Sequence, residues 1–96
     1  MRLVDAHCHL DSFEDRDEVL ARAKAAGVVH LVVNGLWQTA GSFGVALGLA
    51  RERPEISATV AIHPHDCAKA PEEDWELCAR LAEDPRVVAV GETGLD

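Results

Sequence analysis

A chain of 96 residues, 48% of them hydrophobic, is long enough for one small domain with a buried core. It contains no apolar run of about eighteen residues and no apolar segment of signal-peptide length at its start, so we expect neither a membrane partner nor export. Seventeen acidic against nine basic residues give a formal net charge of −8, which excludes nucleic-acid binding through a broad cationic face.

Two kinds of apolar segment alternate along the chain. In chain order, the pattern predicts a strand at 3–7, a helix at 15–27, a strand at 28–34, a helix at 42–53, a strand at 57–63, a helix at 71–84 and a strand at 87–91. Gly27 and Pro54 are typical of residues that follow a helix. The helix at 71–84 is expected to turn one face toward the core, formed by Trp75, Cys78, Ala79 and Ala82.

The order βαβαβαβ predicts an α/β fold with a parallel sheet and right-handed crossovers. A (β/α)8 TIM barrel requires about 250 residues, and the fourth predicted strand is followed by no helix. We therefore interpret residues 1–96 as a single partial domain, the first half of a TIM barrel. Such a half-barrel leaves its first and fourth strands as open edges, through which we expect self-association.

Polar side chains lie where the predicted strands end. His7 and His9 are two positions apart and share one side of the first strand, Asn34 and His63 end the second and third strands, and Glu92 ends the fourth. In parallel α/β folds this carboxyl edge binds ligands. Imidazole and carboxylate groups bind divalent cations, so we expect His7, His9 and Glu92 to hold Mg²⁺, Mn²⁺ or Zn²⁺, which would generate a hydroxide nucleophile from bound water.

The individual residues also have structural interpretations. An HxH pair alone is a weak signal, and the two histidines could instead be hydrogen-bonded residues at a strand end. His63 could orient substrate or belong to a turn before Pro64, and Asn34 could contact substrate or cap a turn. The three cysteines (Cys8, Cys67 and Cys78) form no CxxC motif, which is typical of reduced thiols and predicts a cytoplasmic location.

The segments DAHCHLD, RAKAAGVVHLVVNG, TVAIHPHD and VVAVGETGLD, taken in this order, resemble the N-terminal part of the TatD-type metal-dependent deoxyribonucleases, a family of amidohydrolase-like TIM barrels. The resemblance implies that His7 and His9 bind one metal, that Glu92 holds or bridges two metals, and that His63 lies near the substrate phosphate. It also implies DNA as substrate. The sequence departs from the family in having Ala61 where glycine is frequent, and the family's further ligands, two histidines and an aspartate from later strands, are not among the 96 residues.

These expectations define a function and its rivals. We expect a metal-dependent hydrolase of DNA phosphodiesters, with two metals in the complete enzyme and little activity of the 96 residues alone. Other hydrolases also begin with HxH, but a PHP-type phosphoesterase usually continues with a serine-aspartate-glycine turn, and a dihydroorotase-like amidohydrolase carries a lysine at the position of Glu92. A rival of another class is a non-catalytic half-barrel or small flavodoxin-like binding module, which would bind no metal.

Overall fold

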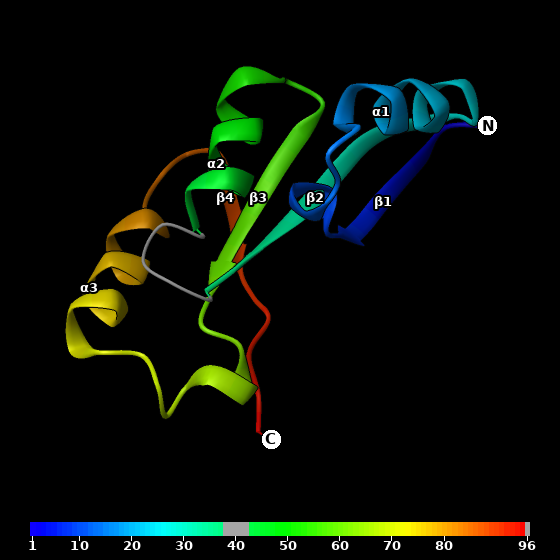
Figure 1. The fold of residues 1–96 in the computed structure, drawn as a ribbon. Helices are drawn as coiled ribbons and strands as arrows, with labels where there is room; N and C mark the ends of the chain where they lie inside the picture. The colour runs from blue at the N-terminus through cyan, green and yellow to red at the C-terminus, as the bar shows by residue number, and fades with distance from the viewer. Residues whose placement is uncertain (38–42, 96) are drawn as a thin grey trace.

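A computed structural model describes residues 1–37 and 43–95 of the chain (Figure 1). The strands are β1 (Leu3–Cys8), β2 (Val28–Leu36), β3 (Ile56–Ala61) and β4 (Val87–Val90), and the α-helices are α1 (Arg16–Ala25), α2 (Phe43–Glu52) and α3 (Glu72–Leu81). Two short 3-10 turns, η1 (Leu10–Ser12) and η2 (Pro64–Asp66), follow β1 and β3. The predicted element order is confirmed, although residue 42, where the second helix was predicted to begin, lies outside the described residues.

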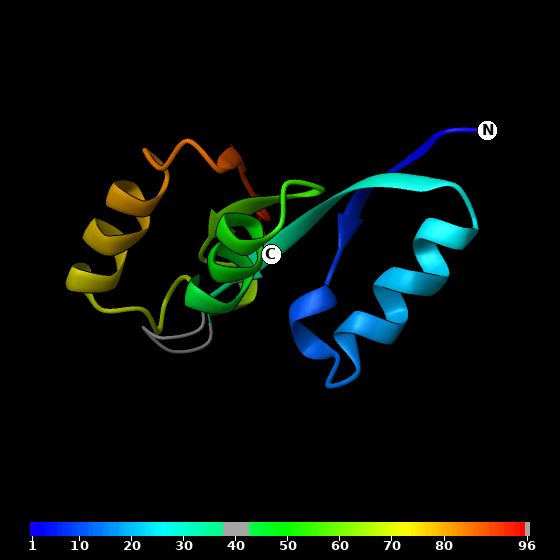
Figure 2. The same ribbon diagram turned by 90° about the horizontal axis from the view of Figure 1, so that it is seen from above.

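The four strands form one parallel sheet in the order β1-β2-β3-β4. This is the topology of consecutive βαβ units, and it agrees with the predicted half of a TIM barrel. Strands β1 and β4 are the two edges of the sheet. Seen from above, the three helices follow one side of the sheet (Figure 2).

The hydrophobic core lies between the sheet and this layer of helices. Strand β3 is buried along its whole length, whereas most residues of β1 and β4 are exposed. One cluster of the core joins β2 and β3 to α1 and α2, and it consists of Leu10, Leu20, Leu31, Val33, Ala46, Ala50, Ile56 and Ala58. A second cluster reaches α3 and consists of Trp37, Phe43, Val60, Ile62 and Cys78.

Helix α3 buries only part of the face that the sequence pattern predicted. Cys78 is buried and Ala82 packs against the second cluster, as expected, but Trp75 is 40% exposed, Ala79 is exposed, and Asp74 is buried instead. The reason is a polar contact between distant segments, in which the indole Nε1–H of Trp37 donates a hydrogen bond of 2.7 Å to Oδ2 of Asp74. This bond satisfies a buried carboxylate and fixes the rotation of α3, so the prediction for Trp75 and Ala79 was wrong.

The chain between α3 and β4 holds the end of α2. The guanidinium group of Arg86 donates to main-chain carbonyl oxygens at the end of α2 and the start of β3, those of Ala50, Arg53, Pro54 and Ile56. Because the last carbonyls of a helix have no partner within the helix, a cation here satisfies them. Hydrogen bonds from the Arg86 main-chain N–H and from the Arg51 side chain lower the pKa of Asp84, which lies in the same corner.

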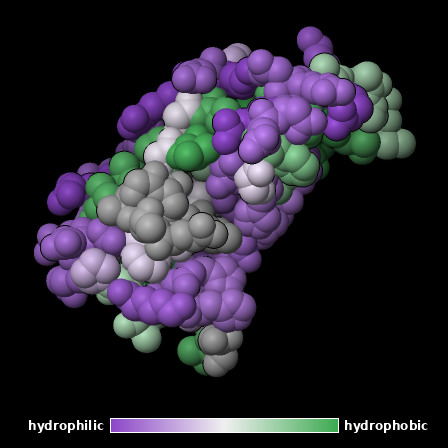
Figure 3. Space-filling model, viewed as in Figure 1, coloured by the Kyte–Doolittle hydropathy of each residue, from purple (hydrophilic) through white to green (hydrophobic). Residues whose placement is uncertain are grey.

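The surface seen in Figure 3 is mostly hydrophilic, with hydrophobic residues near the N-terminus and in smaller patches elsewhere on this face. Several large hydrophobic side chains on the two edge strands are exposed, namely Leu3, Val4, Val88 and Val90. Of the helices in the described ranges, none combines the length and apolar character needed to cross a membrane.

Candidate metal centre

The predicted site residues gather at the carboxyl ends of the strands. His7 lies in β1 and His9 directly follows it, His63 lies two positions beyond the end of β3, and Glu92 lies two positions beyond the end of β4. Strands β1 and β4 are not neighbours, so the sheet must curve for their ends to meet. The curvature of a forming barrel therefore brings residues from opposite edges of the sheet to one place.

The Glu92 carboxylate lies at the centre of three imidazole rings. Its Oε2 atom is 3.5 Å from Nε2 of His7 and 3.4 Å from Nε2 of His9. Its other oxygen, Oε1, is 3.7 Å from Nε2 of His63. All three distances exceed the roughly 2.7–3.2 Å of an N–H···O hydrogen bond. These distances suit ion pairs when the imidazoles are protonated, and they also leave room for a cation between neutral imidazoles and the carboxylate.

The spacing of the ligand atoms fits a divalent cation. One nitrogen each from His7 and His9 and one oxygen of Glu92 lie within 4.8 Å of one another. Ligand atoms about 2.0–2.2 Å from one ion are separated by roughly 3–3.5 Å from each other. The two histidine–glutamate distances of 3.4 and 3.5 Å fall in this interval. Two imidazoles and a carboxylate are also a donor set that Zn²⁺ and Mn²⁺ accept.

His63 presents a hydrogen-bond donor to this cluster. Its Nδ1 atom accepts a hydrogen bond of 3.1 Å from the main-chain N–H of His65, in the turn that Pro64 begins. A neutral imidazole carries one proton, so accepting at Nδ1 places that proton on Nε2. The Nε2–H group then faces Glu92. His63 is thus arranged to donate a hydrogen bond in the site and not to offer a lone pair to a metal.

Asn34 lies beneath the cluster and is 4% exposed. Its amide Nδ2 donates a long hydrogen bond of 3.5 Å to the main-chain oxygen of Cys8, and its Oδ1 accepts one of 2.9 Å from the Thr59 hydroxyl. The contact of Asn34 with substrate stays a prediction. Sequence reasoning missed Thr59, although Ser57 and Thr59 alternate with apolar residues in β3 and so share one face of that strand.

Cys8, between the two histidines in sequence, packs against the helix-side core. Burial raises the pKa of its thiol, and its sulfur donates to the main-chain oxygen of Val32 at 3.5 Å. Cys8 therefore packs as a small apolar residue, as predicted, although it is only partly buried, and all three cysteines are free.

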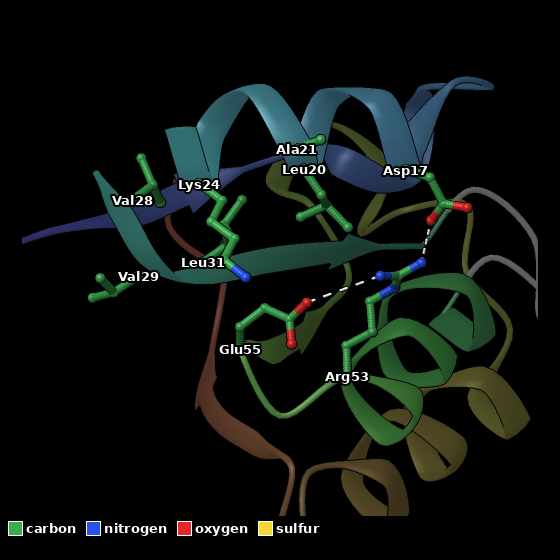
Figure 4. A pocket seen from close by; sticks show the side chains of 9 residues that line it. All are labelled: Asp17, Leu20, Ala21, Lys24, Val28, Val29, Leu31, Arg53 and Glu55. Atoms are coloured by element: carbon green, nitrogen blue, oxygen red, sulfur yellow. Dashed lines mark hydrogen bonds and ion pairs between the residues drawn. The ribbon is translucent and has the colours of Figure 1, made fainter. Parts of the chain in front are cut away.

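A pocket of about 790 Å³ lies away from this cluster, between α1, the first residues of β2 and the segment that precedes β3. Figure 4 shows Arg53 at its rim, where the guanidinium group pairs with Asp17 and Glu55. The floor of the pocket is apolar, with Leu20 and Leu31. Its position at the amino ends of the strands is opposite to the edge where parallel α/β folds bind substrates.

Comparison with known proteins gives consistent matches. Residues 4–96 match the protein family described as "TatD related DNase". The chain is similar to proteins named "3'-5' ssDNA/RNA exonuclease TatD" from Erwinia tasmaniensis (40% identical over 84 residues), Salmonella typhimurium (41% over 83) and Citrobacter rodentium (41% over 85). Each match covers 86% of this chain but only 31–32% of the relative. The chain thus spans about a third of the length of these relatives.

Proposed function

Because the chain belongs to the TatD-related DNase family, we propose that it provides the first ligands of the metal centre of a hydrolase that cleaves DNA phosphodiesters. The observation that carries the proposal is the group formed by His7, His9 and Glu92, whose ligand atoms lie within 4.8 Å of one another and whose two histidine–glutamate distances, 3.5 and 3.4 Å, suit one divalent ion. The names of the relatives, which specify single-stranded DNA and RNA, support a nucleic-acid substrate.

Each residue of the cluster has a distinct role in this proposal. His7, His9 and Glu92 would hold one Mg²⁺, Mn²⁺ or Zn²⁺ ion, and Glu92 would also help to hold a second ion in a two-metal centre. A divalent ion supplies an activated water at neutral pH and polarises the phosphoryl oxygen. His63 donates its Nε2–H to a phosphate oxygen or to the leaving group.

Charge also constrains how a nucleic acid binds. The formal net charge of −8 repels a phosphate backbone, so the substrate must be held at the cluster itself and not across the surface. We expect weak affinity for DNA without divalent ions. The described residues supply three ligand groups, fewer than two metals need, so the 96-residue chain is expected to hydrolyse DNA slowly. Cleavage at about 1 s⁻¹ or faster would contradict this expectation.

The decisive experiment is a titration of the 96-residue chain with Mn²⁺ and Zn²⁺ by calorimetry. Glu92→Gln keeps the shape of the side chain but removes its charge, and it should weaken binding by at least about tenfold. The matched control is Glu76→Gln, at an exposed position of α3. Equal affinity of the two variants would contradict the assignment of Glu92, and no binding by the unaltered chain would favour a non-catalytic binding module.

Three further expectations accompany this proposal. A small-molecule phosphoesterase or amidohydrolase would use the same metal ligands, and assays with nitrophenyl phosphodiesters and with amides would separate it from a nuclease. Self-association through the open edges β1 and β4 predicts a concentration-dependent mass in sedimentation. A cytoplasmic location remains a prediction from the three free cysteines.

A further inference from the structure

A second polar group lies directly beneath the metal cluster. Asn34 of β2 and Thr59 of β3 are opposite each other in the strand register, and each is 4% exposed. The Thr59 hydroxyl is 2.9 Å from Oδ1 of Asn34 and 3.0 Å from the main-chain oxygen of Gly91, and it shares its one proton between these two acceptors. Asn34 continues the chain of contacts through Nδ2 to the main-chain oxygen of Cys8.

This chain of contacts reaches from Cys8 of β1 through β2 and β3 to Gly91, which follows β4, and it ends at the peptide groups next to two of the proposed ligands. The carbonyl group of Cys8 belongs to the peptide that carries the main-chain nitrogen of His9, and the carbonyl group of Gly91 belongs to the peptide of Glu92. The N–H of Gly91 is also held, by the main-chain oxygen of Val60 at 3.2 Å. The pair Asn34–Thr59 therefore contacts the backbone directly next to one ligand from each edge of the sheet.

We propose that Asn34 and Thr59 are positioning residues that fix His9 and Glu92 for metal binding. The inference rests on the proposed metal centre, because it assigns these residues a role toward its ligands. Burying polar groups is costly unless they are hydrogen-bonded, and valine would suit a buried strand at position 59. The hydrogen bonds of this pair fix the orientation of the adjacent backbone, just as groups behind a metal site orient the metal ligands.

The two residues contribute unequally. The bond from Thr59 to Gly91 is 3.0 Å long, whereas the bond from Asn34 to Cys8 is 3.5 Å, at the limit of hydrogen bonding. Loss of the Thr59 hydroxyl also leaves Oδ1 of Asn34 without its donor. Thr59 therefore controls the position of Glu92 more firmly than Asn34 controls that of His9, and substitution of Thr59 is the sharper test.

The main variant is Thr59→Val, which removes the hydroxyl at nearly constant volume. Its control is Ser57→Ala, which removes a hydroxyl from the same face of the same strand. Ser57 is 7% exposed, and its hydroxyl lies 2.7 Å from Nε2 of His30, away from the segments that carry the proposed ligands. The variant Thr59→Ser keeps the hydroxyl and loses only the methyl group. Two quantities are measured for each: affinity for Mn²⁺ by calorimetry, and exchange of the Gly91 amide hydrogen by NMR in metal-free protein.

We expect Thr59→Val to weaken Mn²⁺ binding about tenfold and to speed Gly91 exchange about fivefold. Ser57→Ala should change neither by more than about twofold, and Thr59→Ser should restore both. Equal effects of Thr59→Val and Ser57→Ala would overturn the proposal, because they would indicate general loosening. If the unaltered chain binds no metal, the proposed function fails separately, and unchanged Gly91 exchange in Thr59→Val would then overturn the positioning role as well.

Discussion

Gly35, in the middle of the site-bearing sheet, allows α2 to pack closely on β2, and Gly35→Ala tests this contact. A Cβ atom at residue 35 would lie 2.8 Å from the main-chain oxygen of Thr59 and 3.2 Å from Cβ of Ala46, whereas ordinary contacts begin at 3.4 Å. Neither neighbour can yield by rotating a flexible side chain, because one is backbone within the sheet and the other is a methyl group on a packed helix. The strands or α2 must therefore shift.

Overpacking of this kind costs about 1–3 kcal/mol of unfolding free energy. For a chain of this size each kcal/mol corresponds to about 4–8 °C in Tm, so Gly35→Ala should lower Tm by roughly 5–20 °C. The matched control is Gly48→Ala inside α2, where an added Cβ has no neighbour within 4 Å among the described residues. Alanine at that position favours the helix by about 0.5–1 kcal/mol, so this variant should raise Tm.

The assay is thermal unfolding followed by circular dichroism, with urea unfolding as a second measure. The same chemical change, glycine to alanine, is therefore predicted to lower Tm at position 35 and to raise it at position 48. If both variants raise Tm, the close approach of α2 to β2 is wrong. If both lower Tm by similar amounts, the helix assignment or the open space at Gly48 is wrong.

Three other predictions concern buried and charged groups. Trp37→Phe removes the donor to Asp74 and should lower the unfolding free energy by about 1–3 kcal/mol in urea, whereas an unchanged midpoint would deny that the bond matters. The pKa of Asp84 is lowered, so its stabilising contribution is complete above its ordinary value of about 3.9 and is lost as the pH falls through the lowered value. Asp84→Asn should therefore destabilise the chain at neutral pH and much less at a pH below the lowered pKa of Asp84, and urea unfolding at several pH values checks this. Only the exposed Cys67 should react rapidly with a thiol reagent in the folded chain, because burial raises the pKa of the other two thiols, and a fast second equivalent would contradict this.

Local patterns were sufficient to predict the order of strands and helices. They could not set element ends, because these depend on pairing: β2 continues to Leu36 since it pairs there with Ala61 of β3. The inner face of α3 was predicted correctly for Cys78 and Ala82 and wrongly for Trp75 and Ala79, because the large apolar side chain of Trp75 suggested burial, whereas Asp74 is the residue that turns inward, to the indole of Trp37. That contact joins segments far apart in sequence, so periodicity within the helix contains no trace of it.

The members of the candidate metal cluster could be predicted because the carboxyl ends of parallel strands share an edge. His7, His9 and Glu92 lie at or just beyond the ends of β1 and β4, and the curvature of the sheet brings these two ends together. Thr59 does not end a strand, and its role depends on a hydroxyl that reaches two other strands. The alternation of polar and apolar residues in β3 indicated which face Thr59 lies on. Only the arrangement of the neighbouring strands shows which groups its hydroxyl contacts.

The meeting of the two sheet edges at Glu92 has a consequence for folding. The cluster joins residues near both ends of the sequence, and loops that long are entropically costly to close and slow to form. No isolated hairpin or single βαβ unit contains all three groups, so the site exists only after every crossover has formed. An ion that requires all three groups would therefore bind the folded chain selectively, and free metal at a hundredfold excess over Kd would add about 2.7 kcal/mol to the unfolding free energy. Unfolding midpoints measured against metal concentration would then report on the integrity of the whole sheet.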